Sequence, residues 1–388
     1  MPIDCGVQNA MNKVMKKKFL FGLIYLRINQ VSTDWNLRLF GLTVLKTKVD
    51  VLRSRETLFL LGCIPMLKYS ILDRLRKSYM QMVCSSFPDY DAYFPFASGC
   101  GEIFLMLSHF KEFINQYDYK KPLLIFNSHK LNDIYKLFHL PYDSVVIENV
   151  AGLLLDDKCI FLNKEFITPL NYKYFGKTEK KIITGKLHYY ESLKKRINVY
   201  NTAQLPTITD FDKNKINLIA NIILDNNFVI IMPEALTIKE LDKEFWEKIC
   251  TSLHNKGYKV FLNVTNIHNY IKNTVTIFLD YSEMAALACQ AKAIIGLRNG
   301  FLEVTSMLSN VPSFVIYNKF NSYAQNKLSA NQAINGFSMK KLPFKNVHNI
   351  YEYNYENYSD ELVLQNEIFN DFQQVINTVE KFKDEKTI

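Results

Sequence analysis

The sequence predicts an α/β protein built around parallel sheets. Short apolar runs with the length of buried strands alternate with stretches whose apolar residues recur at helical spacing, and glycine or proline stands at several of the junctions. The chain has 388 residues, of which 48% are hydrophobic and 22% are charged. This composition excludes a disordered chain, and the length allows two or three domains.

The first α/β unit is expected over residues 86–215. A linking helix near residues 70–82 leads into it, and an aromatic stretch at residues 90–96 then precedes a glycine turn that opens a helix. The later elements are a helix over residues 103–117, a strand over 122–126, a helix over 130–138 and a strand over 144–147.

The second unit, over residues 216–340, alternates more regularly. Its strands are expected at residues 228–232, 259–263, 275–279, 293–297 and 313–317, and its helices at residues 238–255, 282–292 and 299–308. Such alternation with short connections is typical of Rossmann-like domains. Residues 341–388 are a C-terminal segment, and the helical periodicity of residues 360–382 predicts a helix that packs back across the first unit.

Residues 1–85 carry a short repeat. Residues 19–28, 38–47 and 59–68 read FLFGLIYLRI, RLFGLTVLKT and FLLGCIPMLK, with the shared glycine at Gly22, Gly41 and Gly62. Each copy is an apolar run that is interrupted by glycine and followed by a cation, as expected of a short strand with a bend at the glycine. The repeats therefore predict a separate β layer.

The net charge of +9 comes from this N-terminal region, because residues 1–85 hold 14 Lys and Arg against 5 Asp and Glu. A neutral body makes nucleic acid an unexpected partner. Apolar residues beside cations are typical of a platform that docks on an anionic membrane surface or on a protein partner. The alternative is a small layer packed on the main domain, and the sequence does not separate these interpretations.

The sequence also indicates a reducing compartment. Seven cysteines are scattered without a C-x-x-C pair or zinc-type spacing, which argues against disulfides and against a structural metal. No run reaches the ~18 apolar residues of a spanning helix. Arg27 interrupts the apolar stretch after Lys16–Lys18, and no cleavage site follows. We therefore expect a cytoplasmic protein, peripheral on the inner face of the cytoplasmic membrane if residues 1–85 bind lipid.

Two segments have the character of ligand sites at helix N-termini, where backbone N–H groups and the helix dipole favour anions. In the first, Arg298, Asn299 and Gly300 connect a strand to a helix that carries Glu303. The arginine offers a forked cation, and the glycine allows close approach of the backbone, so a diphosphate fits there. The alternative is that Arg298 pairs with a nearby carboxylate.

The second segment is the turn Gly99–Cys100–Gly101–Glu102. Its glycines bring the backbone close to a ligand, and Glu102 stands at the start of the following helix, where it would face the same cleft as Arg298 if the two units oppose each other. The alternative is that Glu102 complements the helix dipole and nothing more.

These residues carry a resemblance over roughly residues 95–320. A strand ending in Pro233–Glu234, a helix with Phe245–Trp246, the segment Asp280–Leu287 and the turn at Arg298 resemble the nucleotide-sugar half of bacterial GT-B glycosyltransferases of surface-polysaccharide and lipopolysaccharide assembly. The order of elements is similar to that of heptosyltransferases. The resemblance implies two Rossmann-like domains that face a cleft, with an acceptor domain first and a nucleotide-sugar domain second.

The resemblance also implies roles for residues. The base or ribose of the donor would lie near Pro233, Glu234, Asn263 and Ser282, and its diphosphate at Arg298, Asn299 and Gly300. Gly99, Gly101 and Glu303 are also expected at the donor nucleotide. Gly101–Glu102 matches the Gly-Asp turn that carries the catalytic carboxylate of this group, with Glu in place of Asp. Where heptosyltransferases show Asp-x-Gly-x-x-His, this chain has Arg298 to Glu303, so the ADP-heptose donor does not carry over.

The expected function is transfer of a sugar from a nucleotide sugar to a glycan or lipid-linked glycan, with Glu102 as general base, with Arg298 stabilising the leaving charge, and with no metal or cofactor. Glu303 and His109 are the next candidates for the base. An Asp-x-Asp metal site in a suitable context and a third glycine for a nicotinamide site are both missing from the sequence. A non-catalytic scaffold that binds nucleotides or glycans on the same fold is the alternative.

Overall fold

The computed structural model describes most of the chain. The residues that it does not describe are 1–13, 20–23, 30–34, 40–41, 51–54, 61–63, 71, 149–158, 170–177, 179–180, 183, 207–226, 236, 266–270, 310, 322–326, 343–346 and 386–388. Up to residue 75, side chains are described at Leu37 and Leu42 alone. The predicted domain boundary near residues 215–216 and the repeat glycines Gly22, Gly41 and Gly62 lie outside the described residues.

The chain divides into two compact units that are not contiguous in sequence. Unit 1 comprises Met1–Ala97, Asp118–Asn132 and Pro141–Asn171. Unit 2 comprises Ser98–Tyr117, Asp133–Leu140 and Tyr172–Ile388. The α/β class expected from the sequence is confirmed. Each unit contains a parallel or mostly parallel sheet, and helices alternate with the strands of these sheets along the chain.

Unit 1 begins with a six-stranded antiparallel sheet whose strands follow one another in chain order. Its strands are β1 Val14–Phe19, β2 Ile24–Asn29, β3 Trp35–Leu39, β4 Leu42–Asp50, β5 Arg55–Leu60 and β6 Ile64–Ser70. A separate β region was expected here, but the prediction of one bent strand per repeat is wrong. Each copy supplies the end of one strand and the start of the next, which pair antiparallel, as Phe19 does with Ile24.

The helix α2, Leu72–Ser86, follows this sheet and leads to a second, mostly parallel sheet in the order β10-β11-β7-β8-β9. The bounds of its strands are β7 Ala92–Phe96, β8 Pro122–Phe126, β9 Asp143–Val146, β10 Cys159–Phe161 and β11 Lys164–Phe166. The helix α2 buries Tyr79 and Val83 in one cluster with Tyr93 and Phe166, so the sheet has an aromatic core. The hairpin β10–β11 was not predicted.

The glycine turn after β7 opens α3, Cys100–Leu107, which is followed by α4, Phe110–Ile114. The single helix predicted over residues 103–117 is therefore interrupted. The hydroxyl of Ser108 donates to the carbonyl of Leu105 at 2.7 Å, and the amide of His109 donates to Met106 in a tight 3₁₀-type turn. Before the parallel sheet of unit 2, the described chain also forms the helices α5 His129–Leu137 and α7 Tyr189–Ile197.

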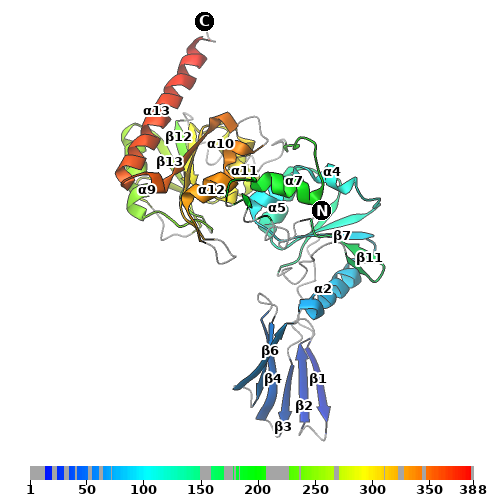
Figure 1. The fold of residues 1–388 in the computed structure, drawn as a ribbon. Coiled ribbons are helices and arrows are strands. Elements are labelled where there is room, and N and C mark those ends of the chain that lie inside the picture. Colours follow the sequence, from blue (N-terminus) through cyan, green and yellow to red (C-terminus); the bar gives the residue numbers. More distant parts are fainter. Residues whose placement is uncertain are drawn as a thin grey trace. The chain divides into compact units, whose positions relative to one another are not determined.

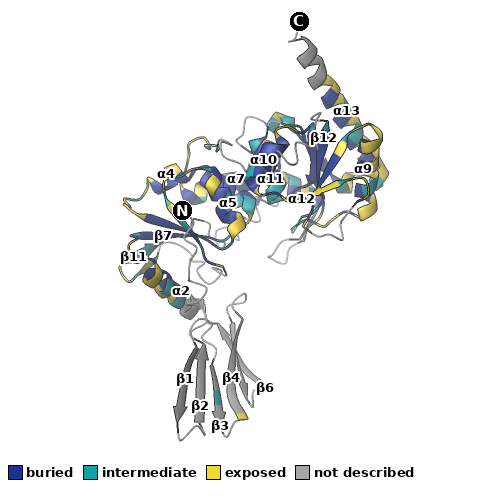
Figure 2. Cartoon of the chain, turned by 180° about the vertical axis from the view of Figure 1, so that it is seen from behind, coloured by how far each residue is buried: buried dark blue, intermediate teal, exposed yellow. Residues whose placement is uncertain are grey.

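Unit 2 contains a six-stranded parallel sheet in the order β14-β13-β12-β15-β16-β19. Numbered along the chain, this order is 3-2-1-4-5-6, which is that of a Rossmann dinucleotide-binding sheet. Figure 2 shows its central strands as buried. The strands are β12 Phe228–Met232, β13 Lys259–Asn263, β14 Val275–Ile277, β15 Ala293–Leu297, β16 Ser313–Tyr317 and β19 Ile350–Asn354.

The helices of this unit are α9 Lys243–Asn255, α10 Tyr281–Ala288, α11 Gly300–Leu308, α12 Ala330–Phe337 and α13 Glu361–Glu385, beside the short pair β17 Phe320–Asn321 and β18 Lys327–Leu328 and the 3₁₀ turns Met339–Lys341, Val347–Asn349 and Tyr355–Asn357. The helix predicted from residue 238 begins later, after Asp242, because Ile238 instead forms a bridge with Phe320.

The C-terminal helix α13 packs on the parallel sheet of unit 2. Its residues Leu364, Ile368, Phe372 and Ile376 share the core cluster of β12, β15 and β16, and α13 lies beside α9 (Figure 1). The expected return of this helix to the first α/β unit is therefore wrong for its described side chains, which bury their apolar stripe in the second core. Among the described helices, none is long and apolar enough to cross a lipid bilayer.

Candidate functional site

The strands β12, β13 and β15 bring several predicted site residues to one edge of the sheet in unit 2. The order reverses between β12 and β15, and ligands of such sheets bind beyond the carboxyl ends of the strands at that point. Asn299, after β15, donates from Nδ2 to the carbonyl of Glu234, after β12, at 2.7 Å. The Glu234 carboxylate accepts from the amide and hydroxyl of Thr265, after β13, at 2.8 and 2.6 Å. Pro233 and Asn263 belong to the same strand ends.

Asn299 also fixes the start of α11. Its Oδ1 accepts the amide of Leu302 at 2.7 Å, so Asn299 is the N-cap and Gly300 is the first helical residue. One amide side chain therefore ties together the end of β12 and the beginning of α11. Backbone amides and the positive end of the helix dipole favour negative charge at a helix start, which makes this end of α11 suitable for an anion.

Arg298 lies just before this cap and is buried. Its Nη2 forms an ion pair with Glu303 Oε2 at 2.5 Å, and the hydroxyl of Tyr189 donates to Glu303 Oε1. The guanidinium also lies over the rings of Tyr189 and Phe337, with its Cζ 5.7 and 5.9 Å from their centroids. Burial raises the pKa of Glu303, and the adjacent cation of Arg298 opposes that rise.

This geometry corresponds to the alternative that the sequence left open for Arg298, namely pairing with a nearby carboxylate. Glu303 is fully buried and engaged on both oxygens, so it is poorly placed to accept a proton from an acceptor substrate. Direct contact of Arg298 with a diphosphate stays a prediction.

The helices α3 and α11 meet at their N-termini, and two glycines permit the contact. A Cβ on Gly101 would lie 2.6 Å from Glu303 Oε2, and a Cβ on Gly300 would lie 2.9 Å from the backbone nitrogen of Gly101. The structure thus brings the two predicted glycine turns together. The positive ends of two helix dipoles, one buried arginine and one buried carboxylate lie within a small volume of unit 2.

We expect Gly101→Ala to lower the free energy of unfolding by about 1–3 kcal/mol, because the added methyl group would overlap a carboxylate that Arg298 and Tyr189 hold in place. Gly99→Ala is the matched control. Its Cβ would contact Glu102 at an ordinary 3.5 Å, and its φ of −68° suits alanine. Denaturant unfolding measures both, and equal stabilities of the two variants would contradict the close contact.

Glu102 occupies the third position of α3 and folds back on the turn. Its Oε2 accepts the amide of Gly99 at 3.1 Å and the hydroxyl of Ser98. The residue is partly exposed. It therefore complements the helix start, which is the alternative that the sequence left open for Glu102. Its role as a base remains a prediction.

Ser282 lies in the first turn of α10, where its hydroxyl donates to Asp280 at 2.9 Å. Asp280 caps the helix by accepting the amide of Glu283 at 2.9 Å. The neighbouring Tyr281 ring lies 4.4 Å from that of Phe301 in α11, so the N-termini of α10 and α11 are adjacent. All of the predicted donor residues thus lie at the helix starts and strand ends of unit 2.

His109, one of the candidate bases, is buried away from solvent. Its Nε2 and the hydroxyl of Tyr190 form a hydrogen bond of 2.6 Å, and burial lowers its pKa to about 4. A neutral, enclosed imidazole is a packing element between α4 and α7.

Sequence reasoning missed Tyr189 and Thr265. Tyr189 belongs to the basic, aromatic run of residues 186–196, in which Tyr189 and Tyr190 are both buried. The two adjacent tyrosines were the available signal, since neighbouring aromatics in a short basic helix indicate one buried side.

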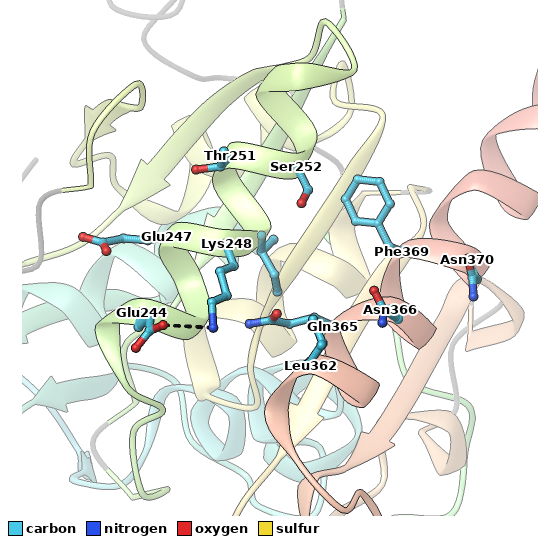
Figure 3. A pocket seen from close by; sticks show the side chains of 11 residues that line it. Glu244, Glu247, Lys248, Thr251, Ser252, Leu362, Gln365, Asn366, Phe369 and Asn370 are labelled. Atoms are coloured by element: carbon cyan, nitrogen blue, oxygen red, sulfur yellow. Dashed lines mark ion pairs between the residues drawn. The ribbon is translucent and has the colours of Figure 1, made fainter.

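A hollow of about 430 Å³ lies elsewhere on unit 2, between α9 and α13 (Figure 3). It is lined by polar and charged side chains, including the pair Lys248–Glu244 at 2.9 Å, and by Leu362 and Phe369. None of the predicted site residues lines it.

No protein-family model and no curated protein matches the sequence. Among solved structures, the fold is similar to a glycosyl transferase of family 9 from Veillonella parvula DSM 2008, with a TM-score of 0.48, 10% identity, and coverage of 75% of this chain and 98% of that chain. It is also similar to E. coli ADP-heptose lps heptosyltransferase II (0.45, 11%, 75% and 99%) and to E. coli heptosyltransferase WaaC with ADP (0.42, 12%, 76% and 99%).

Proposed function

We propose that this protein is a glycosyltransferase that moves a sugar from a nucleotide sugar to a glycan or lipid-linked glycan. The observation that carries the proposal is the meeting of two helix N-termini, α3 and α11, beside the strand ends where the order of the unit 2 sheet reverses. A sheet of this order supports a nucleotide at that edge, and paired helix starts support a diphosphate.

The proposed donor site is assembled by Asn299. The base or ribose lies near Pro233, Glu234, Asn263 and Ser282, and the diphosphate lies against the first turn of α11 at Gly300. Arg298 is paired with Glu303, so in the proposed site it stabilises the turn between β15 and α11. This turn places the positive N-terminal end of α11 beside the phosphates. The proposal requires no metal, since amides and helix dipoles neutralise part of the leaving charge.

In the proposed reaction, the acceptor hydroxyl gives its proton to the Glu102 carboxylate. Its oxygen forms a bond to the anomeric carbon while the bond from that carbon to the diphosphate breaks, and the nucleoside diphosphate leaves with the electron pair. Glu102 suits this task because it is a partly exposed carboxylate at the glycine turn that contacts α11.

The first experiment is a thermal-stability screen with UDP, GDP, ADP and CMP. A nucleotide present at a hundred times its dissociation constant should stabilise the protein by about 2.7 kcal/mol. Incubation with the matching nucleotide sugars and a glycan acceptor, followed by release of the nucleotide (a diphosphate from UDP-, GDP- or ADP-sugars, CMP from CMP-sugars), then tests transfer. Stabilisation by one nucleotide without any transfer would favour the scaffold alternative, and stabilisation by none would contradict the donor site.

The second experiment changes one atom group at the assembled site. Asn299→Asp keeps the cap on Leu302 but loses the donor to Glu234 and adds a negative charge beside the proposed diphosphate. We expect nucleotide affinity to fall about ten- to hundredfold. Asn366→Asp, the same change at an exposed position of α13, is the control. Equal affinities of the two variants, measured by calorimetry, would remove the diphosphate from this turn.

A further inference from the structure

The six-stranded sheet of unit 1 has two faces of different chemistry, and neither face enters the proposed reaction. Alternate residues of a strand lie on opposite faces, and residues paired across neighbouring strands lie on the same face. The register of β1–β6 therefore assigns each paired residue to one face.

One face is apolar. The row that starts at Lys17 continues across the sheet through Leu26, Leu37, Leu45, Leu60 and Ile64. The other apolar residues of this face are Met15, Phe19, Ile24, Ile28, Trp35, Leu39, Leu42, Val49, Leu58, Leu67 and Tyr69. Among the paired residues of the described strands, Lys17 and Glu56 are the charged members of this face.

The opposite face is basic. Its cations are Lys16, Lys18, Arg27, Arg38, Lys46, Lys48, Arg55 and Lys68. Asp50 is the one acid paired on this face within the described strands. The register therefore concentrates nearly all of the N-terminal charge excess on one side of a single sheet, which the linear sequence does not reveal.

Two side chains of the apolar face are described: Leu37 is half-buried, and Leu42 is 75% exposed. The extensive contacts of β1–β6 among the described elements are with one another. An apolar sheet face that continues across six strands and has no extensive contact with another described element is an interaction surface in a folded protein.

We propose that the sheet β1–β6 lies in the interface of an anionic phospholipid membrane, with its apolar face toward the acyl chains and its basic face at the level of the lipid phosphates. Trp, Phe and Leu on one face with Lys and Arg on the other are the signature of elements that lie in this interface. A sheet with side chains on both faces is about 10 Å thick, comparable to the depth that such elements occupy.

Charge decides between this occupant and the others. A second copy of the chain packed on the apolar face would leave two strongly basic faces without a partner. A nucleic acid would pair with the cations but leave the apolar face in water. An anionic interface uses both faces at once, since each cation near such a surface contributes to binding and the apolar area adds to it.

The experiment uses the full-length chain and sedimentation with vesicles of phosphatidylcholine, either alone or with about a third phosphatidylglycerol. We expect binding to the anionic vesicles that weakens as salt is added, and much weaker binding to the neutral ones. This outcome is independent of nucleotide binding, so it can hold or fail whatever the fate of the proposed transferase activity.

Three variants locate the contact. The double change Lys46→Gln, Lys48→Gln removes two cations of the basic face and should weaken binding about 25-fold, at roughly fivefold per charge. Leu42→Ser should weaken binding by roughly ten- to a hundredfold, because a Leu side chain buried in the membrane is lost from the apolar face. The control, Lys243→Gln with Lys248→Gln, removes two exposed charges from α9 and should change nothing. Unfolding midpoints verify that all variants are folded.

Three outcomes would overturn the proposal. The first is equal binding to both vesicle types, and the second is an equal loss of binding in the α9 control. The third is a dimer in light scattering without lipid that Leu42→Ser dissociates, because that result would assign the apolar face to a second copy.

Discussion

Replacing Arg298 by alanine is expected to lower the free energy of unfolding by about 3–5 kcal/mol, because it leaves the Glu303 carboxylate buried without its cation. The loss should appear in denaturant unfolding of the nucleotide-free protein. It would be present whether or not Arg298 ever contacts a donor, which is why nucleotide affinity of this variant alone does not report on the site.

A double change is the matched control. Arg298→Met with Glu303→Leu removes both charges and replaces them with apolar groups, so most of the stability should return. The pH dependence has a defined sign. Burial raises the pKa of Glu303, and without Arg298 that pKa rises further. The folded state of Arg298→Ala is more stable when the Glu303 carboxyl is protonated. This stability is present at low pH and is lost as the pH rises through the folded-state pKa of Glu303.

The defect of Arg298→Ala relative to the parent should therefore grow between pH 5 and pH 8, with the ordinary pKa of glutamate near 4.3 as the lower reference. A defect that stays constant over this range, or a double variant no more stable than Arg298→Ala, would contradict the buried ion pair.

Glu102→Gln is expected to reduce turnover by about 10²–10⁴-fold once the substrates are identified, with nucleotide affinity nearly unchanged. Glutamine can still accept the amide of Gly99 through its carbonyl oxygen, so the turn that starts α3 is preserved while the proton acceptor is lost. The measurement is the initial rate of nucleoside diphosphate release at saturating donor.

Glu283→Gln is the control for this change. Glu283 holds the same third position in α10, where its Oε2 accepts the amide of Asp280 at 3.0 Å, and it has no role in the proposed chemistry. Both variants should show similar changes in stability. If Glu102→Gln transfers sugar at the parental rate, the base is a different residue, and neither Glu303 nor His109 is available while both remain enclosed.

The strands of unit 2 could be predicted to the residue where the sequence is a continuous apolar run. β12 and β15 are examples. Strands that are buried on both faces are apolar throughout, so the change to polar residues marks where they begin and end. β19 was missed because it reads Ile-Tyr-Glu-Tyr-Asn, with a charged residue in its centre. That residue, Glu352, accepts hydrogen bonds from the hydroxyls of Tyr317 and Ser338 at 2.7 Å each. Such a residue looks like a loop residue until its partners are known.

The site was predicted in its parts but not in its connections. The glycine turns and the strand ends are local signals that the sequence carries directly. The choice of Glu303 as partner of Arg298, and the contact of Tyr189 with Glu303 across 114 residues of sequence, arise from tertiary packing. Local patterns specify which groups stand at a helix start, and the fold alone decides which of them neutralise one another.

The contact of Gly101 with Glu303 also has a consequence for biosynthesis. Unit 2 draws α3 from Ser98–Tyr117 and most of its remaining mass from Tyr172–Ile388. At about 5–20 residues per second, translation reaches residue 303 roughly 10–40 s after residue 101. During that interval the protein is still on the ribosome, and α3 lacks its contact with α11. The apolar residues of α3, among them Ile103, Phe104 and Leu105, are therefore not yet fully packed. A chaperone that binds nascent chains should therefore crosslink to this segment until the last third of the protein has emerged.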